Sequence, residues 1–228
     1  MKKVPSLSRP PLPGSAHHPA ARWRGCYSDS MPSAAGNLAH LASEALKAAA
    51  ARLAGPRLVL SLRPGTGDVS HWADGRTELY HHITVRNLRR WSPAKQVRLL
   101  VVGLAKRAPD GAFLPEPLAA PLPLTWAFTG GQERMPSVDR RDVCEFGFLG
   151  EHADRFRLAT GTFPDDFRGF VLAGEAMRVE VIASARNFRS RRPLTIEVSW
   201  DGGWADVREM HRHLAVREVA PGGAGKAH

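Results

Sequence analysis

Two turns of this chain concentrate the side chains with the most obvious chemistry, the guanidinium groups of arginine. Each contains an Arg-Asn pair, Arg86-Asn87 in the first turn and Arg186-Asn187 in the second, and neither turn contains an acidic residue. Arginine forks bidentately to phosphates and carboxylates, so arginines clustered without acids are typical of an anion site. The predicted anion-binding residues are Arg86, Arg89, Arg90, Lys95, Arg186, Arg189, Arg191 and Arg192.

Composition offers a second explanation for this charge. The chain has 32 lysines and arginines against 22 acids, a net charge of +10, and all but six of the basic residues are arginine. GC-rich coding would also produce a chain rich in arginine, alanine, glycine and proline. The charge permits attraction to nucleic acid, anionic lipid or acidic protein. The alternative is a pair of solvated loops whose aromatic residues pack at the rim.

Two histidines near the C-terminus are the candidates for metal binding. His211 and His213 alternate in a predicted strand, which places both imidazoles on one face, where they can supply two ligands to a zinc ion. A third ligand would come from His71, His81 or His82, and nothing in the spacing requires one. A surface strand with its polar residues outward explains the pattern equally well.

Motifs of known enzyme classes do not occur in the sequence. It has no Gly-x-Ser-x-Gly elbow, no phosphate-binding P-loop, no Gly-x-Gly-x-x-Gly run and no His-Glu-x-x-His pair. Cys144 lies beside Asp142 and Glu145, whose negative charges raise the pKa of a thiol rather than activate it. We therefore expect neither enzymatic activity nor a cofactor.

Strands are the elements that must hold the two turns. An alternating stretch precedes each turn, and counting back from the two asparagines places apolar residues on the same face in both copies, with His81 as the exception. We therefore expect two hairpins whose turns lie at one end of the fold. About nine strands are predicted: Arg57–Leu62, Leu79–Val85, Val97–Leu104, Leu124–Phe128, Val143–Phe148, Arg155–Ala159, Met177–Ala185, Leu194–Trp200 and Leu214–Val219.

This pattern predicts a mainly β fold, an antiparallel immunoglobulin-like β-sandwich preceded by a disordered arm and one α-helix. An open barrel is the alternative architecture. Residues 1–33 are predicted to form a disordered basic arm rich in proline and serine, and residues 34–55 an Ala-rich helix that ends at Gly55-Pro56. The β-domain then spans residues 56–219, followed by a disordered tail at 220–228.

Several features favour a cytoplasmic protein. The chain has no apolar stretch of about 18 residues that could span a membrane. Lys2 and Lys3 are not followed by the apolar run of a secretory signal. Two cysteines, Cys26 and Cys144, make no disulfide framework and fit a reducing compartment.

The stretch Val85-Arg86-Asn87, with Ala94 and Val97 after it, resembles bacterial immunoglobulin-like modules of the cell-adhesion-related (CARDB-like) type. The run Gly174–Val181 before the second Arg-Asn pair is similar to the closing strands of such a module. This resemblance covers about Arg57–Val219 and implies a non-catalytic binding or spacer module. The sequence thus predicts a non-enzymatic module that binds another protein through sheet edges or loops. Nucleic-acid or polyanion binding through the arginine turns is the alternative, and a metal-dependent enzyme built on His211 and His213 is the third.

Overall fold

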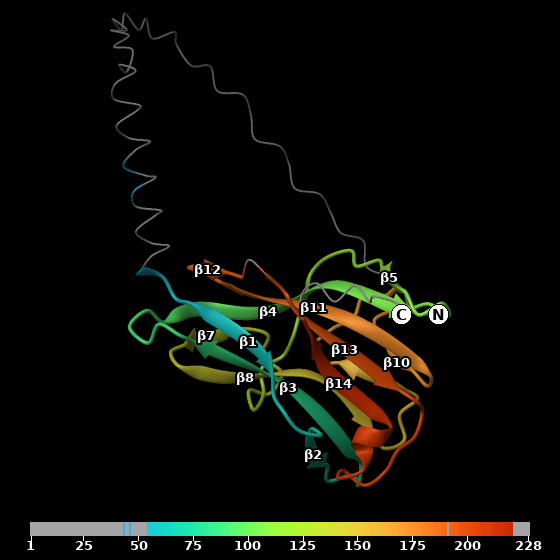
Figure 1. Ribbon diagram of the computed structural model, residues 1–228. Helices are drawn as coiled ribbons and strands as arrows, with labels where there is room; N and C mark the ends of the chain where they lie inside the picture. The colour runs from blue at the N-terminus through green and yellow to red at the C-terminus, as the bar shows by residue number, and fades with distance from the viewer. Residues whose placement is uncertain (1–42, 44–45, 47–53, 191, 221–228) are drawn as a thin grey trace, which may run out of the picture. The chain divides into compact units, whose positions relative to one another are not determined.

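Two antiparallel sheets make up the fold in the computed structural model, which describes residues 43, 46, 54–190 and 192–220 (Figure 1). Within these residues the first sheet has the order β1-β3-β8-β9-β10, with β2 beside β3. The second has the order β14-β13-β11-β4-β5, with β12 beside β11 and with β6 and β7 beside β4. The chain is therefore mainly β with antiparallel sheets, as predicted.

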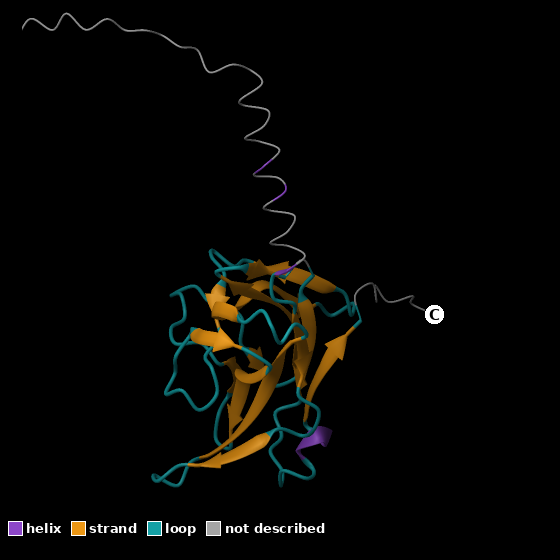
Figure 2. Cartoon of the chain, turned by 90° about the vertical axis from the view of Figure 1, so that its left-hand side faces the viewer, coloured by secondary structure: helices purple, strands orange, loops and turns teal. Residues whose placement is uncertain are grey.

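The four longest strands, β3, β4, β8 and β11, lie inside the two sheets, and the other strands are shorter. Their bounds are β1 Leu58–Leu62, β2 Asp68–His71, β3 Thr77–Asn87, β4 Ala94–Arg107, β5 Phe113–Glu116, β6 Leu122–Pro123, β7 Met135–Val138, β8 Arg141–Gly150, β9 Arg155–Leu158, β10 Val171–Leu172, β11 Glu175–Ala185, β12 Phe188–Arg189, β13 Leu194–Trp200 and β14 Leu214–Val219. One short 3-10 helix, η1 (Met210–Arg212), precedes β14 (Figure 2). Several predictions fall outside the described residues. These are the arm at 1–33 with Cys26, nearly all of the predicted helix and tail, and Arg191.

The core draws on alternate positions of strands from both sheets. Leu79, Ile83 and Val85 of β3 are buried on one face, and Val179 and Val181 of β11 are buried on the facing sheet. Residues two apart in a strand point the same way, so each sheet contributes one apolar face. Burial of that apolar area is the main term that stabilises the fold.

One predicted strand, Leu124–Phe128, does not form. Leu124 and Trp126 are fully buried, but each makes only an isolated bridge, Leu124 with Thr160 and Trp126 with Cys144. The chain then turns at Phe128, whose φ of 62° is incompatible with a strand. The apolar side chains at these alternate positions therefore pack into the core, but the backbone does not form a continuous strand.

Candidate functional site: a basic groove beside strand β1

The two Arg-Asn turns have different roles in the chain path. The first connects β3 in the first sheet to β4 in the second, and β4 pairs with β11 rather than with β3. It is therefore a crossover, and the prediction of a first hairpin is wrong. The second turn is a hairpin, in which Ala185 of β11 pairs with Phe188 of β12.

Asn87 holds the first turn from inside. Its side chain is only 4% exposed. The Oδ1 atom accepts hydrogen bonds from the backbone N–H groups of Arg57 and Arg89, both at 3.1 Å. The Nδ2 group donates to the carbonyl oxygens of Ser92 at 2.8 Å and Val138 at 3.3 Å. Asn87 therefore ties the start of β1, the turn and β7 together.

Asn187 is exposed and binds the other turn. Its Oδ1 atom accepts a hydrogen bond from the Lys95 N–H at 3.2 Å, and its Nδ2 group donates to the Pro93 carbonyl oxygen at 3.2 Å. The Arg186 N–H also donates to the Lys95 carbonyl oxygen at 2.8 Å. These contacts place the two turns side by side at one end of the sheets.

A groove with a volume of about 910 Å³ opens beside the second turn, between β1 and the segment that joins β12 to β13. Volumes of this size are typical of ligand-binding clefts. The described residues that line it are Gly55, Pro56, Arg57, Leu58, Val59, Leu60, Arg89, Asn187, Phe188, Arg189, Ser190, Arg192, Pro193 and Leu194.

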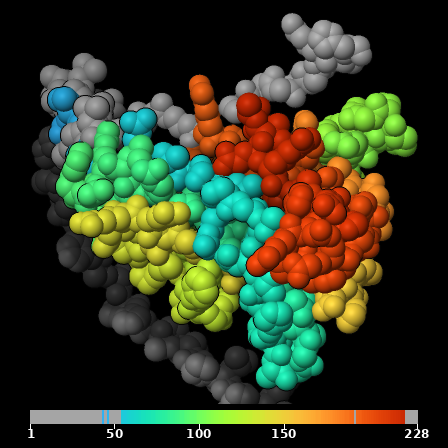
Figure 3. All heavy atoms as spheres, turned by 60° about the horizontal axis from the view of Figure 1, so that its bottom comes forward, coloured from blue at the N-terminus to red at the C-terminus, as the bar shows by residue number. Residues whose placement is uncertain are grey.

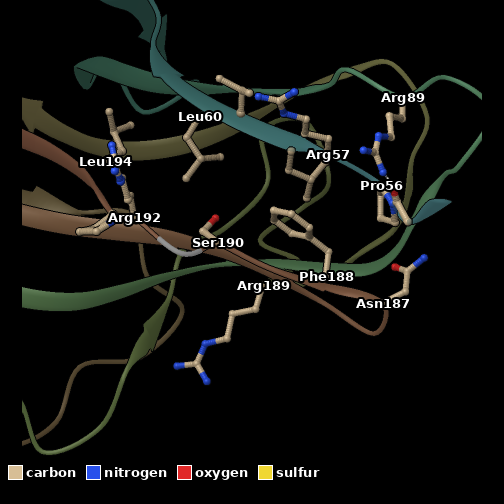
Figure 4. Close-up of a pocket in the computed structure, with 14 residues that line it drawn as sticks. Pro56, Arg57, Leu60, Arg89, Asn187, Phe188, Arg189, Ser190, Arg192 and Leu194 are labelled. Carbon is tan, nitrogen blue, oxygen red and sulfur yellow. Dashed lines mark hydrogen bonds between the residues drawn. The ribbon is translucent and has the colours of Figure 1, made fainter. Parts of the chain in front are cut away.

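The groove has an apolar floor and a basic rim. Figure 4 shows the Phe188 ring and the Leu60 side chain turned into the groove. Arg57 lies along β1 and Arg89 beside Pro56, whereas Arg189 extends away from β1. An apolar centre with a charged margin is the arrangement that protein interfaces use.

Electrostatically, the groove is positive because the described residues that line it include several arginines and no aspartate or glutamate. Within the described residues, no acidic side chain forms an ion pair with Arg57, Arg189 or Arg192. Arg89 donates from Nη1 to the Gly55 carbonyl oxygen at 2.9 Å. An anion entering the groove would therefore meet the guanidinium groups of Arg57, Arg189 and Arg192, which pair with no acid among the described residues.

A second arginine cluster in the same molecule is gathered around a buried carboxylate. Glu197 of β13 is 3% exposed, and its carboxylate pairs with Arg217 at 2.6 Å, Arg178 at 3.0 Å and Arg107 at 3.1 Å. Burial works to raise the pKa of this carboxyl, but the hydrogen bonds from Arg217 and Arg178 outweigh burial and hold the pKa below its usual value. These three arginines share one buried carboxylate, whereas Arg57, Arg189 and Arg192 of the groove form no ion pair among the described residues.

The backbone of β1 turns unpaired groups toward the groove. The Leu88 N–H donates to the Arg57 carbonyl oxygen and the Arg63 N–H donates to the His82 carbonyl oxygen, both at 2.8 Å. Hydrogen-bonded positions alternate along an antiparallel pair. Residues 57, 59, 61 and 63 therefore bond to β3, and the N–H and C=O groups of Leu58 and Leu60 point to the other side. Within the described residues β1 pairs with β3 alone, so this side is a free sheet edge.

Both ends of that free edge are closed. The outward N–H of Leu62 donates to the carboxylate of Glu218, which reaches across from β14. In Figure 3 the cyan residues of β1 lie next to the red residues of the C-terminal strands. At the other end, Pro56 has no N–H to offer. The open part of the edge is limited to Leu58 and Leu60.

The predicted anion-binding residues are divided by the structure. Arg89, Arg189 and Arg192 line the groove, whereas Arg86, Arg90, Lys95 and Arg186 do not, and Arg191 lies outside the described residues. Sequence reasoning missed Arg57, because it belongs to the strand before the first turn rather than to the turn. Its position beside alternating Leu58 and Leu60 is the signal that could have identified it.

The predicted metal-ligating pair is not on a strand, because β14 begins only at Leu214. His211 lies in η1, with Nδ1 at 2.8 Å from the Arg208 carbonyl oxygen. His213 follows η1, with Nδ1 at 3.0 Å from Oδ2 of Asp201. In the part of the chain that the structure describes, no three histidine, cysteine, aspartate or glutamate side chains are grouped to hold a metal ion.

Cys144 is buried in β8, where its Sγ lies 3.0 Å from the Thr125 carbonyl oxygen. Burial, helped by the charge of Glu145, raises the pKa of this thiol well above its usual value. A neutral buried thiol is a packing residue.

No helix among the described residues is both long and apolar enough to cross a membrane.

No protein-family model matches the sequence, and no curated protein matches it significantly.

Proposed function

We propose that this chain is a non-enzymatic, cytoplasmic protein-binding module that accepts an extended segment of a partner at the free edge of β1. The single observation that carries the proposal is the pair of outward N–H and C=O groups on Leu58 and Leu60, next to an apolar groove floor. In strand addition, such backbone groups supply the affinity and adjacent pockets select the side chains. The proposal includes an immunoglobulin-like β-sandwich as the scaffold of this edge.

The packing around β1 supports this mode of binding. β1 is anchored on its far side by five residue pairs with β3, from Leu58–Asn87 to Leu62–Ile83. Asn87 fixes the backbone at its start. A rigid, preorganised edge loses little conformational entropy when a partner adds to it, so more of the interaction energy appears as affinity.

Hydrogen exchange with selected peptides tests the proposal. A random peptide library would be screened against the full chain and counter-screened against Leu60→Pro, which removes one outward N–H and no bond to β3. Bound peptides should slow exchange at the Leu58 and Leu60 amides and leave Val59, already paired with β3, unchanged. Peptides that bind equally to Leu60→Pro and protect other amides would refute strand addition at β1.

Polyanion binding is the second candidate, because three predicted arginines and Arg57 gather in one groove without an acid. That function predicts binding to DNA, RNA or heparin that weakens steeply with salt, since each phosphate contact releases counterions. Arg89→Glu and Arg189→Glu together should abolish such binding, and Arg86→Glu, outside the groove, should not. Salt-insensitive binding would exclude this candidate.

A further inference from the structure

We propose that the segment accepted by the groove has the pattern acidic–apolar–acidic in an extended conformation. This inference rests on the proposed function, and it adds the chemistry of the partner to the place where the partner binds. Three features of the groove specify the pattern: its charge, the alternation of an added strand, and the length of the open edge.

The charge of the groove requires acidic residues. Arg57, Arg189 and Arg192 line it, and no carboxylate stands among the lining residues that the structure describes. Carboxylates recognise guanidinium groups through paired, charge-assisted hydrogen bonds. A basic partner would be repelled, and a neutral one would leave this charge unused.

The alternation of an extended chain requires the apolar residue between the two acids. Side chains of a strand point alternately to the two faces. If one partner residue faces the floor formed by Leu60 and Phe188, its two neighbours face outward. On that outer side Arg57 and Arg192 are exposed. One apolar residue flanked by two carboxylates therefore satisfies the floor and the rim together.

The length of the open edge limits the partner to a short segment. Leu58 and Leu60 each offer one N–H and one C=O outward, while the Leu62 N–H is already bound to Glu218. The Glu218 carboxylate would also repel an acidic segment that ran further along β1. A peptide of roughly three to five residues, at about 3.3 Å per residue, covers this edge.

The remainder of this chain does not fit the pattern. Residues 1–42 contain one acidic residue, Asp29, which stands between two serines, and residues 221–228 contain none. The phosphate backbone of a single-stranded nucleic acid also fits less well, because phosphates only accept hydrogen bonds and offer no donor to the Leu58 and Leu60 carbonyl oxygens. The partner is therefore an acidic segment of another protein.

The direct test is fluorescence anisotropy with a labelled peptide, Gly-Ser-Glu-Leu-Glu-Ser-Gly, and the full chain. Replacing both glutamates of the peptide by glutamine should weaken binding at least about tenfold, as expected for losing charge-assisted bonds. Of two peptides N-methylated on alternate amides, only one should lose binding, because strand pairing uses every second amide.

Protein variants locate the site. Arg57→Gln combined with Arg192→Gln should weaken binding about tenfold. The matched control, Arg217→Gln, removes an equally charged side chain that pairs with Glu197 away from the groove, and should change affinity less than about twofold. Thermal melting of each variant checks that the fold is intact.

The outcomes separate this inference from the proposed function. If library peptides protect Leu58 and Leu60 but carry no acids, or if the glutamine peptide binds as well as the glutamate peptide, the acidic pattern is wrong and strand addition stands. If no peptide protects these amides, both are wrong. If a ten-nucleotide single-stranded DNA binds more tightly than the glutamate peptide without protecting the amides, polyanion binding replaces both.

Discussion

The two Arg-Asn turns have nearly the same sequence and opposite relations to the fold. Asn87 is buried and makes four hydrogen bonds that join three segments, while Asn187 is exposed and makes two to the neighbouring turn. The first turn crosses between sheets and the second closes a hairpin within one sheet. The same short motif therefore makes buried hydrogen bonds between segments in one turn and exposed hydrogen bonds to a neighbouring turn in the other. The surroundings of the motif decide which of the two it makes.

The largest expected difference between the two turns is in stability. Asn87→Ala leaves two backbone N–H groups and two carbonyl oxygens without their partners in a buried site, so the free energy of unfolding should fall by about 3 kcal/mol. Urea denaturation followed by tryptophan fluorescence measures this. If Asn87→Ala lowers the free energy of unfolding no more than Asn187→Ala does, the two asparagines contribute equally to stability.

Acid should lower stability by about 2 kcal/mol between pH 7.5 and 5 without changing the difference between the turns. Burial, assisted by the charge of His82, lowers the pKa of His81 to about 4, against about 6.5 in an unfolded chain. Because the unfolded chain takes up this proton first, the stabilisation from neutral His81 is complete above about pH 6.5 and is lost as the pH falls towards 4.

Neither asparagine titrates, so the gap between Asn87→Ala and Asn187→Ala should be the same at both pH values. His81→Leu should remove most of the pH dependence over this range, and part should remain because burial also lowers the pKa of His82. Glu145, whose pKa is raised by burial, acts in the opposite direction and is unchanged in that variant. If His81→Leu keeps the full acid sensitivity, the buried histidine is not its source.

A smaller loss, about 1 kcal/mol, is expected for Asn187→Ala, because the exposed backbone groups of Lys95 and Pro93 can bond to water instead. Hydrogen exchange at the Lys95 amide should accelerate in this variant and stay unchanged in Arg90→Ala, a nearby surface control. Unchanged exchange at Lys95 would mean that the second turn does not hold the first in solution.

The smallest effect is expected for the arginines themselves. Arg189→Gln should change the free energy of unfolding by less than about 0.5 kcal/mol, as is usual for an exposed side chain. Glu197→Gln, which removes the carboxylate that three arginines share, should cost about 2 to 3 kcal/mol. Similar costs for the two variants would mean that the groove arginine Arg189 and the arginines around Glu197 do not differ in their contribution to stability.

The sequence predicted the strands better than their partners. The buried faces of β3 and β11 follow the alternation counted back from the two asparagines, because burial depends on side-chain order within one strand. The first hairpin was predicted wrongly, because the apolar run in β4 can pair with any strand of suitable face and pairs with β11. Partner choice is a property of the whole core, which a local pattern does not contain.

The groove also depends on contacts between segments that are distant in the sequence. Arg89, Arg189 and Arg192 were selected by residue type within the two turns, but their position beside β1 depends on which edge of the first sheet is left open. His211 and His213 alternate as a strand would, yet the turn from Asp206 to Met210 places them outside β14. The alternation of the two histidines therefore comes from one residue inside a short 3-10 helix, His211, and one at its C-cap, His213, and not from a strand.

The contact between Glu218 and the Leu62 N–H also sets how long a complex would last. By closing the edge after Leu60, it restricts a partner to a few backbone hydrogen bonds and a small buried area. Contacts of that size dissociate rapidly, so one such segment would exchange readily. A partner that carries several copies of the segment could rebind before it diffuses away, and its residence time would then grow with the number of copies.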